Sequence, residues 1–340
     1  MSGIPLLVTR GGELITGRGY RVYGPRRNGR PGEELRASYA PGGSKQLLAS
    51  TALGCRVARE GIHRLYETPG GDWIAIAKGM ILHRRPGEAR FRLATDGFRG
   101  SRPLYLGFQP ESGNWYFGEY FANTDRSKAV HIYRSRTGAR WQVAYTFPPG
   151  SIRHVHNIVW DSFRRGLWVL TGDRDHESGL WFTADDFATL RREHGGSQAY
   201  RAVSLLLTER WLLVPSDTPL ERNAIRRIDR ATGAVAPVAE LASSAFHTYR
   251  AGGGHELLVT TVGEPSAVND SNHAYLYASA DGARWVQRSR FPRDVWSKLS
   301  CFLFRYPEVI PVGHTPDGVL HCVGIALSDC GYGHLQIKLR

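Results

Sequence analysis

Short apolar runs separated by polar turns dominate the chain, and apolar residues nowhere keep the 3.6-residue period of a helix over a long stretch. Runs of this length that are rich in aromatic and branched residues are typical of β-strands. Five such runs read DWIAIAKG (72–79), NWYFGEYF (114–121), LWVLTGD (167–173), WLLVPSD (211–217) and ELLVTTVGE (256–264). The pattern therefore predicts an all-β protein.

Each of these five runs lies between two others of similar character. The preceding runs are GIHRLYE (61–67), RPLYLGF (102–108), HVHNIVWD (154–161), AVSLLLT (202–208) and AFHTYRA (245–251). The following runs are MILHRR (80–85), AVHIYRS (129–135), GLWFTAD (179–185), AIRRIDR (224–230) and AYLYASA (274–280). A fourth, edge-like segment closes most units: RFRLAT (90–95), WQVAYTF (141–147) and RWVQRSRF (284–291).

The repeating unit is thus four antiparallel strands in about 45–50 residues, which is the length of a propeller blade. Five units lie between about residues 61 and 297. We predict a six- or seven-bladed β-propeller with four-stranded antiparallel blades. It forms a single domain over residues 1–340, in which 1–60 and 298–340 complete and close the ring.

The amino-acid composition agrees with an all-β propeller, and the N-terminal sequence bears on where in the cell the protein is expected. The 340 residues are 41% hydrophobic and include 39 glycines and 18 prolines, which suits many short strands joined by tight turns. No apolar stretch reaches the ~18 residues of a membrane span. The first residues show no signal peptide, so we expect a cytoplasmic protein, or a secreted or periplasmic one if a leader has been removed. The four cysteines have no metal-binding spacing.

Charge narrows the expected partners. The formal net charge is +13, which favours polyanions such as acidic glycans. The arginines are scattered and form no basic block, so an acidic glycan is favoured over nucleic acid. No Walker or dinucleotide-binding motif is visible, and we predict no cofactor. The oligomeric state is left open.

Two segments resemble the Asp-box of sialidase-type (BNR) propellers: YRSRTGARW (133–141) and YASADGARW (277–285). The segment TADDF (183–187) resembles it more weakly. Further segments, including FGEYFANTDR, SIRHVHNIVWD, LWVLTGDRDHE and SDTPLERNAIRRIDR, resemble a bacterial family of BNR-type propeller proteins described as sialidase-like or glycosyl-hydrolase-like. The resemblance covers about residues 50–297 and implies a sialidase-like propeller. The family name brings no proven reaction.

Polar residues recur at two places in each unit. In a propeller, the link into an innermost strand and the loop after the second strand lie on one face. We therefore expect basic links and acidic strand ends to converge on a central funnel, the usual place for a ligand. Four of the five units end their second strand near a carboxylate: Glu119, Asp173, Asp217 and Glu264.

Hydrolysis of a glycan is the favoured function, because two suitably spaced carboxylates suffice for a glycosidase. The candidate catalytic residues are Glu119, Asp173, Asp217, Glu264, His156 and Tyr200. The candidate substrate-binding residues are Arg102, Tyr120, Asn123, Arg126, Arg153, His154, Glu177, Arg201 and Asn223. Arginines suit a carboxylate or sulfate group on the substrate.

Two other functions fit the same residues. A polysaccharide lyase would use His or Tyr to abstract a proton beside a uronate that an Arg neutralises. A non-catalytic propeller would bind a glycan or protein in the same funnel. His154 and His156 also raise a metal question, because residues i and i+2 of a strand point the same way. We assign no metal here, since such a pair is more often hydrogen-bonded.

Overall fold

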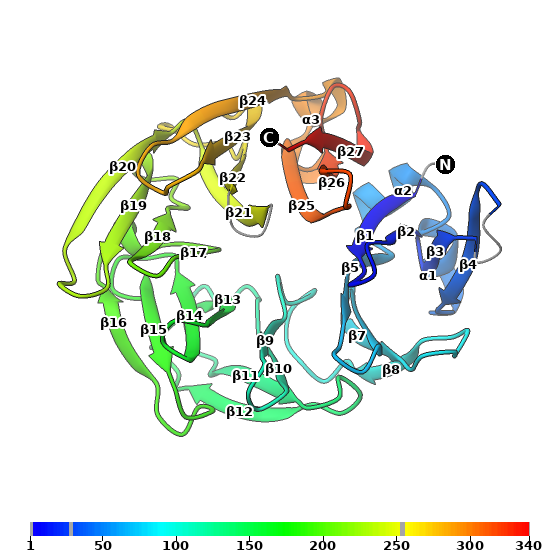
Figure 1. The fold of residues 1–340 in the computed structure, drawn as a ribbon, viewed down its shortest axis with the longest axis horizontal. Coiled ribbons are helices and arrows are strands. Elements are labelled where there is room, and N and C mark those ends of the chain that lie inside the picture. The colour runs from blue at the N-terminus through cyan, green and yellow to red at the C-terminus, as the bar shows by residue number, and fades with distance from the viewer. Residues whose placement is uncertain (1–2, 27–29, 252–255, 340) are drawn as a thin grey trace. The chain divides into compact units, whose positions relative to one another are not determined.

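The computed structural model describes residues 3–26, 30–251 and 256–339. The chain divides into two compact units. Unit 1 comprises Met1–Gly97, Thr137–Ala139 and Phe291–Arg340, and unit 2 comprises Phe98–Arg136 and Arg140–Arg290. Both units are built from antiparallel strands that follow one another in chain order, and Figure 1 shows one such meander in green, β13–β16.

Unit 1 contains two four-stranded sheets, in the orders β1-β2-β3-β4 and β5-β6-β7-β8, and the run β25–β27. The first sheet is β1 (Ile4–Val8), β2 (Leu14–Arg18), β3 (Arg21–Pro25) and β4 (Glu33–Ser38). The second is β5 (Ile62–Glu67), β6 (Trp73–Ala77), β7 (Met80–Arg84) and β8 (Arg92–Thr95). The run is β25 (Glu308–His314), β26 (Val319–Ile325) and β27 (Tyr332–Lys338).

Unit 2 contains three four-stranded sheets and a fourth four-strand run, whose last strand ends just beyond the unit. The first two sheets are β9 (Gly107–Gln109), β10 (Asn114–Gly118), β11 (Val130–Ser135), β12 (Gln142–Phe147), then β13 (His154–Asp161), β14 (Gly166–Gly172), β15 (Gly179–Thr183), β16 (Arg191–Gly195). The others are β17 (Leu206–Leu207), β18 (Trp211–Pro215), β19 (Asn223–Asp229), β20 (Val235–Leu241), then β21 (Ser244–Ala251), β22 (Glu256–Val262), β23 (His273–Ser279), β24 (Val286–Pro292).

The described strands thus form six sheets, five of them four-stranded and antiparallel, which confirms the predicted all-β fold and its repeating unit. Two predicted strands are much shorter than expected. RPLYLGF yields only β9, since Pro103 has no N–H for a strand ladder. AVSLLLT yields only β17, because side chains of β13 bind the carbonyl groups of Ala202 and Val203. The outer strands β16 and β20 were not predicted, since they are too exposed to show an apolar pattern.

Helices also occur where none was expected. They are α1 (Gly43–Leu48), α2 (Ala52–Ala58), α3 (Val295–Leu299), α4 (Cys301–Phe304) and the 3₁₀ turn η1 (Gln198–Tyr200). Each is too short to produce a visible 3.6-residue period, and α2–α4 begin at side-chain caps on Thr51, Asp294 and Ser300. No described helix has the length and apolar character needed to cross a membrane.

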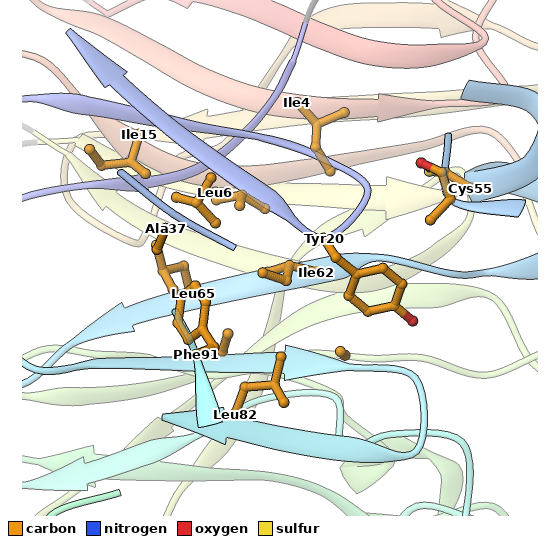
Figure 2. Packing of buried hydrophobic residues seen from close by; sticks show 14 of the residues in the cluster. Ile4, Leu6, Ile15, Tyr20, Ala37, Cys55, Ile62, Leu65, Leu82 and Phe91 are labelled. Atoms are coloured by element: carbon orange, nitrogen blue, oxygen red, sulfur yellow. The ribbon is translucent and has the colours of Figure 1, made fainter. Parts of the chain in front are cut away.

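Apolar cores form within each unit. In unit 1, Leu6, Ile62, Leu82 and further buried side chains from successive strands pack into one cluster (Figure 2). In unit 2, all seven residues of β14 are buried, so this second strand of its sheet is covered on both faces. Continuous burial of this kind explains why LWVLTG reads as one apolar run instead of an alternating pattern.

One irregularity recurs at the start of several first strands. The pairing register shifts by one residue between Ile62 and Arg64 in β5, between Val155 and Asn157 in β13, and between Ala245 and His247 in β21. Such a bulge adds an unpaired residue and re-aims its side chain. In β13 the extra residue is His156, so this repeated backbone feature helps to set the direction of a candidate site residue.

The turn predicted from YASADGARW joins β23 to β24, the third and fourth strands of their run. Asp281 accepts hydrogen bonds from the backbone of Ala283 and Arg284 at 2.8 and 2.9 Å, and Gly282 has a φ of 73°. The Trp285 indole donates to the Gly282 carbonyl at 3.1 Å. The acidic residue therefore braces a tight turn, which is a structural role.

Candidate functional site

Charged residues at strand ends of three sheets and one further run meet inside unit 2. Arg153 precedes β13, Asp173 follows β14, and Arg201 follows η1. Asp217 and Glu264 lie two residues beyond β18 and β22. Together with neighbouring rings they form what we call the Asp173 cluster: Tyr120, Arg153, His154, His156, Asp173, Arg201, Asp217 and Glu264.

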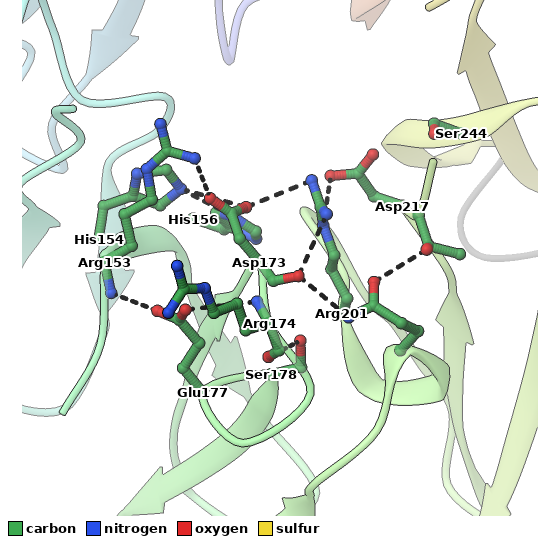
Figure 3. A network of polar contacts seen from close by, with 12 residues as sticks. Arg153, His154, His156, Asp173, Arg174, Glu177, Ser178, Arg201, Asp217 and Ser244 are labelled. Atoms are coloured by element: carbon green, nitrogen blue, oxygen red, sulfur yellow. Dashed lines mark hydrogen bonds and ion pairs between the residues drawn. The ribbon is translucent and has the colours of Figure 1, made fainter. Parts of the chain in front are cut away.

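Asp173 is the centre of this cluster (Figure 3). Arg153 Nη1 lies 2.5 Å from Oδ2, and Arg201 Nη2 lies 3.2 Å from Oδ1. His154 and His156 each place Nε2 near the same Oδ1, at 3.7 and 3.8 Å. The Asp173 side chain is 13% exposed and that of Arg153 is 30% exposed, so the cluster reaches solvent at one edge.

The two histidines are held through their other ring nitrogens. His154 Nδ1 lies 3.2 Å from the Phe121 carbonyl, and His156 Nδ1 lies 2.8 Å from the Ala202 carbonyl. Their Nε2 atoms are 3.1 Å apart, and the Tyr120 ring packs on His154 with centroids separated by 4.1 Å. Both Nε2 atoms thus face each other beside Asp173.

A second acidic group adjoins the first through Arg201, whose Nε lies 3.7 Å from Asp217 Oδ2. Since one guanidinium spans both carboxylates, they are within about 9 Å of each other, a separation that two-carboxylate chemistry can use. Gln198 binds the Asp173 carbonyl at 3.0 Å and was not among the predicted residues. Its position just before Tyr200 and Arg201 was the only sequence signal for it.

The surroundings shift the pKa values of the three carboxyl groups in different directions. Burial alone would raise the pKa of Asp173, but contacts with His154 and His156 outweigh it and hold that pKa well below its usual range. Burial and the negative charge of Asp217 raise the pKa of Glu264 to about 7. Burial also raises the pKa of Asp217, although Arg201 opposes this.

The environment also favours the neutral forms of His154 and Tyr120. Burial lowers the pKa of His154, although Asp173 opposes the effect. Burial, together with the charges of Asp217 and Asp173, raises the pKa of the Tyr120 hydroxyl. The cluster therefore holds an ionised Asp173, a carboxyl group that retains a proton near neutrality, and a protonated phenol.

Two predicted acids lie outside the cluster in fully occupied positions. Glu119 is 1% exposed and its carboxylate accepts hydrogen bonds from the Arg99 side chain and from the backbone of Arg99 and His131. Glu177 pairs with Arg126 and accepts the Arg153 backbone N–H at 2.6 Å. Because every oxygen has partners, these groups brace loops and the structure gives them no free electron pair aimed at a ligand.

Other candidates have similar local roles. Asn223 bonds Ser216, Thr218 and Asn269, and Asn123 bonds the backbone of Lys128 in both directions. Tyr200 stacks on His194 instead of joining the cluster.

A glycine makes the close approach of these side chains possible. A Cβ added at Gly172 would lie 3.0 Å from Arg201 Cγ and 3.1 Å from His156 Cε1. Contacts this short would displace both side chains. The glycine that ends β14 therefore allows Arg201 and His156 to reach Asp173.

Comparison with known proteins defines the fold. No protein-family model matches the chain, and no curated protein matches it in sequence. The structure is similar to a chain of a mitotic checkpoint complex, with 13% identity, 99% of this chain and 87% of that chain covered, and a TM-score of 0.56.

Two enzyme structures are also similar. The GH74 enzyme of Niastella koreensis has 12% identity over 84% of this chain, with a TM-score of 0.53, and a prolyl endopeptidase has 10% identity over 98%, with a TM-score of 0.59. The chain corresponds to only 45% and 49% of those two chains. The protein is therefore a β-propeller protein, a class that serves hydrolases, peptidases and signalling proteins alike.

Proposed function

We propose that this protein is a carbohydrate-active enzyme that hydrolyses an acidic oligosaccharide at the Asp173 cluster. The observation that carries the proposal is the neighbourhood of Glu264, whose pKa is raised to about 7, and Asp217, whose Oδ2 lies 3.7 Å from Arg201 Nε. Groups that retain protons near neutral pH supply the acid of glycoside hydrolysis. The similarity to a GH74 enzyme supports the fold of such an enzyme and leaves its reaction to the site.

Glu264 is the proton donor in this proposal. With a pKa of about 7 it carries a proton for a large fraction of the time at neutral pH and can release it to the glycosidic oxygen. Asp217 acts as the base or nucleophile in its ionised form, which the nearby Arg201 favours against the effect of burial. Asp173 stays ionised and positions the two arginines.

Arg153 and Arg201 hold the anionic group of the substrate. The Nε atoms of both are buried and have no hydrogen-bond partner among the described residues. A guanidinium with unused donors suits a carboxylate or sulfate, which can accept several hydrogen bonds at once. The net charge of +13 attracts such a polyanion over a longer range.

β-Elimination on a uronate glycan is the second candidate, and Tyr120 favours it. Its protonated phenol lies on the neutral His154 ring, close enough to Arg153 and Asp173 for their charges to act on it. A neutral imidazole can accept the proton next to a uronate that the arginines neutralise, while the phenol protonates the leaving oxygen.

The test is a screen of acidic and neutral oligosaccharides that records bound ligand, new reducing ends and near-ultraviolet absorbance. Hydrolysis gives reducing ends without absorbance, and Glu264→Gln or Asp217→Asn lowers kcat by about 10²–10⁴-fold. The exposed Glu209→Gln, also in unit 2, leaves kcat unchanged.

Three other results of this screen would contradict the proposed hydrolysis or its assigned residues. An absorbing, unsaturated product that Tyr120→Phe abolishes establishes elimination instead. A glycan that binds at an Arg201-dependent site and yields no product establishes a binding propeller. Hydrolysis that neither carboxyl variant slows removes Asp217 and Glu264 from the mechanism.

A further inference from the structure

We propose that His154, His156 and Asp173 form a three-ligand site for a divalent transition-metal ion of the Zn²⁺ type. The site would lie in the same cluster as the proposed acid pair, but the inference rests on other atoms and holds whichever reaction the protein performs. The ligand set, two imidazole nitrogens and one carboxylate oxygen, is of the kind that such ions prefer.

Distances among the three donor atoms fit a single ion. The two Nε2 atoms are 3.1 Å apart, and they lie 3.7 and 3.8 Å from Asp173 Oδ1. The point equidistant from the corners of this triangle is about 2.1 Å from each, which is the bond length of Zn²⁺ to imidazole nitrogen and carboxylate oxygen. The three donor atoms therefore already have the spacing that one ion requires.

The hydrogen bonds of the rings provide an independent reason. A carbonyl oxygen only accepts, so the bonds to Phe121 and Ala202 place the ring protons of both histidines on Nδ1. In a neutral imidazole the other nitrogen then carries a lone pair. Two lone pairs facing each other at 3.1 Å repel unless a cation lies between them.

That cation is either a proton or a metal ion. A shared proton would join only the two ring nitrogens and would leave Asp173 Oδ1, at 3.7 and 3.8 Å, beyond hydrogen-bond distance of both. A metal ion uses both lone pairs and the carboxylate at once. Backbone carbonyls that fix the outer ring nitrogens are also the usual supports of metal-binding histidines.

Two arginines beside a metal ion are unfavourable by themselves, so the charge balance matters. Arg153 binds Asp173 Oδ2, whereas Oδ1 lies 3.2 Å from Arg201 Nη2 and 3.7 and 3.8 Å from the two histidines. The carboxyl groups of Asp173, Asp217 and Glu264 offset part of the positive charge of the two arginines and the ion. Three protein ligands also leave a position for water or an anionic substrate oxygen.

Among the described residues, His154, His156 and Asp173 are the group of three His, Cys, Asp or Glu side chains whose donor atoms lie close enough together to hold one ion. The pair His321 and His334 shows the contrast. Their Nδ1 and Nε2 atoms lie 2.8 Å apart, so one ring can donate to the other. That pair therefore serves as the matched control.

The experiment measures Zn²⁺ binding to the full chain after chelation and desalting. Calorimetric titration with Zn²⁺ alone gives one equivalent per chain for the wild type. His154→Ala and His156→Phe each weaken the affinity by at least about 100-fold. The control His334→Ala binds as the wild type does.

A second measurement does not depend on any variant. Co²⁺ bound to the wild type in place of Zn²⁺ gives visible ligand-field bands, and X-ray absorption of the Zn²⁺ form shows two nitrogen neighbours at imidazole distance. The inference is overturned if no divalent ion binds, or if binding persists unchanged in both histidine variants. Nitrogen NMR showing an imidazolium shared between His154 and His156 in a protein that takes up no metal also overturns it.

Discussion

Two runs of strands in unit 2, β13–β16 and β21–β24, have matching registers between their first two strands. Val155 pairs with Thr171 and Asn157 with Leu170, so His156 is the unpaired residue. Ala245 pairs with Thr261 and His247 with Thr260, so Phe246 occupies that place in the other run. The two runs therefore share a backbone frame, including its bulge.

The side chains at equivalent positions of this frame differ. Ser244 stands where the other run has His154, Phe246 where it has His156, and Gly263 where it has Asp173. Neither the strand pairing nor the bulge requires the histidines or the aspartate. The comparison teaches that the strand frame alone does not account for these three residues.

The largest expected effect comes from giving β13 the residues of β21. The double variant His154→Ser, His156→Phe should lose at least about 1,000-fold in zinc affinity, because two of three ligands are removed. Its unfolding midpoint should change little, since the same residue types occupy this frame in β21. Calorimetric titration and thermal unfolding measure the two effects. Retained zinc binding would mean that the two histidines are not metal ligands. Loss of cooperative unfolding would mean that they are needed for the fold.

A second difference lies at the far end of the two first strands. Asp161 in β13 is fully buried and binds the Trp168 indole at 2.8 Å and Arg230 at 2.7 Å, whereas Ala251 has the equivalent place in β21. Asp161→Ala leaves Arg230 without its buried partner and should cost about 3–5 kcal/mol in the free energy of unfolding.

Urea denaturation measures this cost. Glu193→Ala is the control, because it removes a half-exposed ion pair with Arg164 in the same sheet and should cost less than about 1 kcal/mol. Equal costs for the two variants would mean that Asp161 is solvated and not a buried anchor of its sheet.

The third prediction concerns Glu264, which follows β22. In the chelated protein its pKa of about 7 exceeds the ordinary 4.5, so the folded state keeps a proton that the unfolded state loses. This group therefore favours folding less as pH rises from about 4.5 to 7. Glu264→Gln removes the penalty, and its unfolding midpoint should rise relative to wild type between pH 5 and pH 8. With Glu209→Gln the difference should stay constant, and a flat profile for both variants would refute the raised pKa.

The smallest expected effect tests the glycine of β14. Gly172 pairs with His154, and Val262 occupies the equivalent position of β22, where a side chain is tolerated. Gly172→Ala should displace Arg201 and His156, weaken zinc binding by about tenfold and cost about 1 kcal/mol of stability. Val262→Ala is the matched change in the other run, and it should leave zinc affinity as it is.

Much of the fold could be predicted because a buried strand requires a short run of apolar residues, which is visible in the sequence. Apolar runs such as HVHNIVWD and LWVLTGD coincide with β13 and β14 almost residue for residue. Exposed outer strands such as β16 show no such apolar run, and helices of four to seven residues show no apolar period. In those segments capping and pairing with neighbours decide the conformation, and an apolar period does not.

The sequence by itself determined the four-strand repeat and the chemical types of the candidate site residues. Both can be recognised from the spacing of apolar runs and of the polar residues that follow them. It did not separate Glu119 from Asp173, because both follow a second strand in the same way. Only the tertiary structure decided that Arg99 and backbone donors occupy Glu119, whereas Asp173 lies beside the Nε2 atoms of two histidines. The physical reason is that hydrogen-bond partners and burial come from residues distant in sequence, and these set which carboxylate remains available to a ligand.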